Sequence, residues 1–77
     1  MDDTRFPNID DLIQSDGEVT LGRIGPFSCA ATAGDRHCSY AMLVGRPDES
    51  LMALLARLDA AIEDAIEREI YVDEING

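Results

Sequence analysis

Two cysteines and a single histidine are the side chains best suited to nucleophilic or metal chemistry: Cys29, His37 and Cys38. A cysteine–histidine nucleophilic pair requires the two side chains to converge. His37 and Cys38 are adjacent in a segment that we expect to be a strand, so their side chains point to opposite faces. We therefore expect no catalytic residue and no enzymatic activity.

The same residues also form a poor metal site. A structural zinc ion takes four ligands, usually from closely spaced pairs, and the sequence has no CxxC or HxxxH motif. We expect no metal and no other cofactor, and we interpret His37 as an exposed turn residue. Three states of the thiols stay open: two buried free thiols, which the pattern favours, a Cys29–Cys38 disulfide, or a reactive thiol.

Carboxylates at regular spacing form the other candidate site. Asp59, Glu63 and Glu67 recur at four-residue steps, which on a helix makes one row with about 6 Å between neighbours. Asp64 can pair with Arg68 at the same spacing, so the row has no obvious cation. Anions near a helix C-terminus are disfavoured, and like-charged neighbours cost ~0.2–0.5 kcal/mol each. The row is either a solvated helix face or a ridge that docks on a basic protein surface.

The net charge of the chain makes nucleic acids and anionic membranes poor binding partners. The 77 residues hold 16 acidic side chains and six arginines, with no lysine, which gives a formal charge of −10. Such a surface repels phosphate backbones and anionic lipid, so we expect neither direct nucleic-acid binding nor membrane binding. The chain is too short for more than one domain, which we place at residues 1–77 with 1–5 frayed. It opens with acids and lacks the basic start of a signal peptide, so we expect a cytoplasmic protein.

In its size, its charge and the row of Asp59, Glu63 and Glu67, the chain resembles in general character the nucleic-acid-mimicking inhibitors of phages and mobile elements. Anti-CRISPR and anti-restriction proteins are the familiar cases. The resemblance implies an inhibitor that covers a basic surface of its target, with that row as the primary contact and Asp64 and Glu74 in support. The alternative is a structural protein that assembles into a homo-oligomer, such as a homodimer, with the acidic surface serving solubility only.

The middle of the chain predicts the sheet that would support this helix. Val19 and Leu21 alternate with small residues over 18–24, and Ile24-Gly25-Pro26 reads as a three-residue connection to a strand over 27–33. Gly34-Asp35 fits a two-residue hairpin turn before a third strand over 36–44. This register places Phe27 opposite Met42.

That register also divides the side chains between two faces. The predicted core face consists of Val19, Leu21, Phe27, Cys29, Ala31, Cys38, Tyr40, Met42 and Val44. The opposite face is small and weakly polar, which an ordinary solvent face is not. Two interpretations of it stay open: partial cover by the N-terminal segment, or a surface for a partner or a second copy.

Helices are expected on both sides of these strands. Asn8 can cap a short helix over 9–14, and Asp48 can cap a long one over 49–70. Apolar residues of the long segment follow helical spacing: Leu51, Leu54, Leu55, Leu58, Ile62, Ala65 and Ile66, with Glu69 or Ile70 next. The predicted class is α+β, a three-stranded antiparallel meander with a short N-terminal helix and a long C-terminal amphipathic helix on one sheet face. Whether the N-terminal acids join the helix acids in one patch depends on where the short helix packs.

Overall fold

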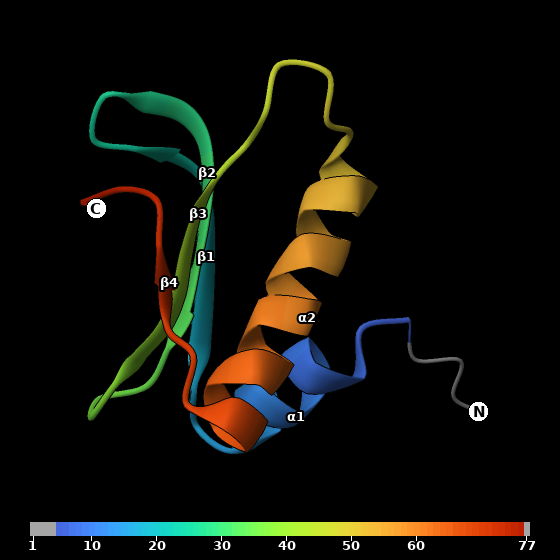
Figure 1. The fold of residues 1–77 in the computed structure, drawn as a ribbon, viewed down its shortest axis with the longest axis vertical. Coiled ribbons are helices and arrows are strands. Elements are labelled where there is room, and N and C mark those ends of the chain that lie inside the picture. The colour runs from blue at the N-terminus through green and yellow to red at the C-terminus, as the bar shows by residue number, and fades with distance from the viewer. Residues whose placement is uncertain (1–4, 77) are drawn as a thin grey trace.

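In the computed structural model, which describes residues 5–76, two helices cover one face of a four-stranded sheet (Figure 1). The elements are α1 (Pro7–Gln14), β1 (Glu18–Ile24), β2 (Phe27–Gly34), β3 (Ser39–Val44), α2 (Leu51–Arg68) and β4 (Val72–Asp73). Neighbours in the sheet follow the order β1-β2-β3-β4. The α+β class and the helix–meander–helix order are confirmed, whereas the expectation of frayed residues lies, apart from Arg5, outside the described range.

The prediction of three antiparallel strands is incomplete, because β4 adds a fourth strand that runs parallel to β3. Val72 and Asp73 are its only residues. A strand of two residues shows no alternation of apolar and polar side chains, so no sequence pattern reveals it. Its position beside β3 brings the C-terminal segment back to the sheet (Figure 1).

The first hairpin turn is tighter than predicted. Ile24 pairs with Phe27, so Gly25 and Pro26 alone form the turn. Gly25 has a φ of +59°, which suits the first central position of a type II′ turn and which an L side chain rarely adopts. Val19 and Leu21 nevertheless lie on the helix-covered face, as expected, opposite Ala33 and Ala31.

The second connection overturns the predicted register. Gly34 pairs with Ser39, so four residues, 35–38, join β2 to β3 in place of a two-residue Gly34-Asp35 turn. The Asp35 carboxylate organises this loop, since Oδ1 accepts the backbone N–H groups of His37 (2.8 Å) and Cys38 (2.9 Å). Its Oδ2 accepts the Tyr40 hydroxyl at 2.9 Å. These bonds, that from His37 first, lower the pKa of Asp35.

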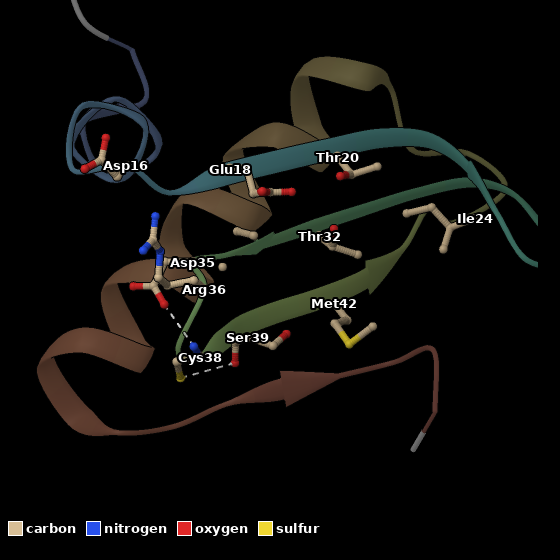
Figure 2. A pocket seen from close by; sticks show the side chains of 12 residues that line it. Asp16, Glu18, Thr20, Ile24, Thr32, Asp35, Arg36, Cys38, Ser39 and Met42 are labelled. Carbon is tan, nitrogen blue, oxygen red and sulfur yellow. Dashed lines mark hydrogen bonds between the residues drawn. The ribbon is translucent and has the colours of Figure 1, made fainter.

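The longer loop exchanges the two faces of β3. Met42 lies opposite Thr32 and not opposite Phe27, a shift of five residues along β2. An odd shift turns each side chain to the other face of the sheet. Met42 therefore points away from α2 together with Thr20 and Thr32 (Figure 2), and the predicted core face is wrong for Met42 and Val44 of β3.

The core lies between the sheet and the helices. Its buried members are Leu12, Ala31, Ala33, Ala41, Leu43, Leu54, Leu58, Ala61 and Ile62. Tyr40 stays partly packed against them, because a β-bulge opposite Ala33 and Gly34 leaves it as an extra residue on β3. The small alanines of β2 and β3 let α2 approach closely, so the large buried side chains come mostly from the helix.

Both helices differ in detail from the prediction. α1 begins at Pro7 and not at Ile9, and α2 is capped by Ser50, whose Oγ accepts the Ala53 N–H at 3.1 Å. The buried stripe of α2 is rotated, so Leu51 and Ile66 are exposed. No helix within residues 5–76 has the length and apolar character needed to cross a membrane.

The N-terminal helix settles one open question about the sheet. α1 packs on the same side as α2, with Leu12 in their shared core, so α1 does not cover the opposite face. That face carries an open hollow of about 650 Å³ (Figure 2), with Thr20, Thr32 and Met42 on its floor. Asp16 and Arg36 lie at one end of it.

Candidate partner-binding face

Asp59, the first residue of the predicted row, has three internal hydrogen bonds. Its Oδ1 accepts the backbone N–H groups of Asn8 (2.8 Å) and Ile9 (2.9 Å), and its Oδ2 accepts Asn8 Nδ2 at 3.0 Å. These are the unpaired donors at the N-terminus of α1, where the helix dipole also favours an anion. Asp59 therefore caps α1 from α2 and is only partly exposed.

A signal for this cap is present in the sequence but is indirect. Pro7 is the first helical residue of α1, so the capping position falls on Phe6, whose side chain accepts no hydrogen bond. Asn8, predicted as the cap, lies inside the helix instead. A helix start without its own cap leaves its first N–H groups to water or to an acceptor from elsewhere in the chain, and Asp59 supplies that acceptor.

Glu63 and Glu67 continue the row in a different environment. Both are exposed, and within residues 5–76 neither side chain takes part in a hydrogen bond or an ion pair. Successive residues of the row are about 40° apart around the helix, so the row turns slowly away from Asp59. Within the described part of the chain, these two carboxylates therefore take no part in holding the elements together.

Asp64 lies beside them but is paired, as the spacing predicts. Arg68 Nη1 lies 2.7 Å from Asp64 Oδ1, one helical turn away. Both side chains are well exposed, so this ion pair contributes little to stability. It does pair Arg68, the basic residue in the last turn of α2, so the negative charge of Glu63 and Glu67 is not offset there.

Glu74 lies on the opposite flank of α2. Its Oε2 is 3.0 Å from Arg57 Nη1, and its Oε1 accepts the Val44 N–H at 2.9 Å. Arg57 is two residues before Asp59, which is about 200° around the helix axis. The structure therefore does not bring Glu74 together with the row, and its carboxylate completes the edge of β3.

Arg57 also organises a network that the sequence did not indicate. Its Nε lies 2.8 Å from Glu49 Oε2, and its Nη2 donates to the Val44 carbonyl at 2.9 Å. The hydrogen bond to Arg57 lowers the pKa of Glu49 to about 2. In turn the pKa of Arg57 is raised, with Glu49 as the largest cause. This network joins the start of α2 to β3 and to the C-terminal segment.

The N-terminal acidic residues lie on the same side of the sheet as the acidic residues of α2. α1 is held beside α2 by the bonds to Asp59, so the two acidic segments share one helical layer (Figure 1). Asp10 and Asp11 are exposed on α1, as Glu63 and Glu67 are on α2. We use the name acidic helix face for these four exposed residues of the one helical layer.

The structure separates Cys29, near the start of β2, from His37 and Cys38 in the β2–β3 loop. Cys29 and Cys38 are free, but Cys29 is exposed and Cys38 half-buried, so the prediction of two buried thiols is wrong. His37 is exposed in the β2–β3 loop, as expected. Within the range 5–76 no three His, Cys, Asp or Glu side chains gather in a way that could hold a metal ion.

The acidic helix face has to be interpreted from its own geometry and charge. No protein-family model, no curated protein and no solved structure matches the chain.

Proposed function

We propose that the protein is a small acidic protein-binding module that works without catalysis, by docking its acidic helix face on a basic surface of another protein. The observation that carries the proposal is the pairing of α1 with α2 through Asp59. It places exposed carboxylates of two separate acidic segments in one layer. In that layer, Glu63 and Glu67 have no internal partner within residues 5–76.

Physical arguments support a charged partner. Carboxylates carried on packed helices lose little backbone freedom on binding, which lowers the entropic cost of association. A net charge of −10 also steers a positively charged partner toward the protein and raises the association rate at low salt. Binding of this kind weakens as salt screens the charges.

Basic protein surfaces are commonly those that bind nucleic acid, which defines the finer proposal. The module would be a nucleic-acid-mimicking inhibitor of the anti-CRISPR or anti-restriction type, encoded by a phage or mobile element. It would occupy the groove in which its target holds a phosphate backbone. Glu63 and Glu67 would be the primary contacts, with Asp10 and Asp11 of the same helical layer in support, whereas Asp59 would act by holding α1 in place.

Capture from a lysate of the native host tests this function, using a matched pair of single charge reversals. Glu67→Lys and Asp48→Lys each change the net charge by two units, but Asp48 lies before α2, outside the acidic helix face. We expect the wild type and Asp48→Lys to retain the same protein and Glu67→Lys to lose most of it. Duplex DNA should displace the captured protein, and retention should fall steeply between 50 and 500 mM salt.

Two results would overturn the proposal. One is equal retention by Glu67→Lys and Asp48→Lys, which would remove the acidic helix face from the contact. The other is binding that salt does not weaken. If only the competition by DNA fails, the proposal of nucleic-acid mimicry is refuted and the proposal of protein binding stands.

A further inference from the structure

The two edges of the sheet differ in how their backbone groups are occupied. β4 closes one edge with two residues, and Glu74 adds its backbone N–H to Met42 O and its side chain to the Val44 N–H. β1 forms the other edge with seven residues. Within residues 5–76, no hydrogen bond outside the β1–β2 ladder involves the backbone of residues 18–24. The outward N–H and C=O groups of β1 are therefore available to another strand.

The side chains of β1 do not protect this edge. Natural edge strands are commonly shortened or carry lysine or proline near their middle. The middle of β1 is Val19-Thr20-Leu21-Gly22, with neither of these, and the charged residues stand near the ends. The strand is irregular toward its end, where Gly22 has a φ of +129° and the register with β2 shifts before Ile24. Leu21, at the centre, is 42% exposed on the helix-covered face.

The helix above this edge extends the apolar surface. Figure 2 shows α2 crossing behind the sheet at an angle, with its first turn emerging beyond the free edge of β1 in that view. Leu51 and Met52 in this turn are 53% and 46% exposed. These two side chains add to the apolar surface exposed on the side of the sheet on which Leu21 is exposed.

The charge order along β1 favours a second copy of the same strand. Glu18 stands at its beginning and Arg23 near its end. Antiparallel pairing centred on Leu21 sets Glu18 opposite Ile24 of the other strand and Arg23 opposite Val19, twice by symmetry. Glu18 and Arg23 point to opposite faces and form no ion pair, but no like charges face each other in this register. We propose that the protein forms a homodimer in which β1 pairs antiparallel with β1 of a second copy.

The proposed dimer has a defined architecture. The twofold axis passes through the Leu21 pair perpendicular to the sheet, so the two four-stranded sheets join edge to edge. The α2 helices of the two copies then lie on the same side of the joined sheet. The interface removes from water part of the Leu21 side chain that the monomer leaves exposed.

Sedimentation equilibrium over a range of protein concentrations, with a reductant to exclude Cys29 cross-links, tests the dimer. The test variant is Leu21→Lys. Its matched control is Thr32→Lys, which adds the same charge to the inner strand β2, on the face with the hollow. We expect wild type and Thr32→Lys to dimerise alike and Leu21→Lys to raise the dissociation constant at least tenfold. Because added lysine lowers the mutual repulsion of two −10 chains, a loss of association cannot come from net charge.

The salt response keeps this inference separate from the proposed function. Screening reduces the repulsion between two acidic copies, so dimerisation should strengthen with salt whereas docking on a basic partner should weaken. The dimer is refuted if the wild type stays monomeric at every protein and salt concentration, or if Leu21→Lys associates as tightly as the wild type. Dissociation by Thr32→Lys alone would move the contact to the hollow and would also refute it. Partner capture by a monomeric Leu21→Lys would still succeed if the proposed function is correct.

Discussion

The acidic row of α2 contains two regions with the same charge and spacing but opposite surroundings. Asp59 accepts three hydrogen bonds from the start of α1. Glu63 and Glu67, one and two turns further on, are exposed and have no partner within residues 5–76. The position of α1, and not the spacing of the row, therefore decides which of the three carboxylates stabilises the fold.

The largest effect should come from removing the cap. Asp59→Ala leaves two backbone N–H groups of α1 without an acceptor, and we expect it to lower the free energy of unfolding by about 1–2 kcal/mol. Urea denaturation followed by circular dichroism measures this change. Glu63→Ala is the control in the other region and should stay within ~0.5 kcal/mol of the wild type. Equal effects of the two substitutions would erase the distinction between the regions.

On the other flank of α2, Glu49 is a carboxylate that stabilises the fold through Arg57, and its contribution should depend on pH. The folded-state pKa of Glu49 is about 2, below its ordinary 4.5, because Arg57 hydrogen-bonds the ionised form. Its stabilising contribution is therefore complete above pH 4.5 and is lost as the pH falls toward 2. We expect Glu49→Gln to be less stable than the wild type at neutral pH, with a difference that closes across this window.

An Arg57→Met background provides the control for that pH response. Glu49 there has lost its cation, so the further change Glu49→Gln should have little effect on the free energy of unfolding at any pH. Urea unfolding at a series of pH values gives the free-energy difference that Glu49→Gln causes in the wild type and in the Arg57→Met background. A Glu49→Gln difference that keeps its size down to pH 2 would show that the carboxylate does not stabilise the fold through its charge.

A smaller and more local effect is expected in the β2–β3 loop. Asp35→Ala removes the acceptor of the His37 and Cys38 N–H groups, so hydrogen exchange at these two amides should accelerate. The Tyr40 pKa, which its hydrogen bond to Asp35 raises, should fall toward its ordinary value in an ultraviolet titration. Unchanged exchange at both amides would mean that the carboxylate does not order the loop.

The elements of the fold follow from the sequence more readily than their register does. Alternation around Val19 and Leu21, the Gly25-Pro26 break and the period of α2 predict the strands and the long helix. The face of β3 could not be predicted, because the run of alanines in β2 offers no contrast between large and small side chains. Asp35 then stabilises a four-residue loop where Gly34-Asp35 fits a shorter turn.

The candidate site was only partly visible in the sequence for a related reason. Helical spacing predicts the Asp64–Arg68 pair and the exposed Glu63 and Glu67, since these depend on α2 alone. The roles of Asp59 and Glu74 depend on segments that are distant along the chain. Such contacts arise from packing, on which local patterns carry no information.

The smallest effect on stability is expected where we place the function. We assign Asp59 to the fold and the other two carboxylates of the row to a partner. The measurement that tests this assignment is the free energy of unfolding, at low salt, of the double variant Glu63→Lys/Glu67→Lys compared with that of Asp59→Ala. We predict that the double variant is as stable as the wild type or more stable by up to ~1 kcal/mol, because it removes anions near the helix C-terminus. A loss of more than ~1 kcal/mol, similar to that of Asp59→Ala, would show that the fold needs these carboxylates and would contradict their assignment to a partner.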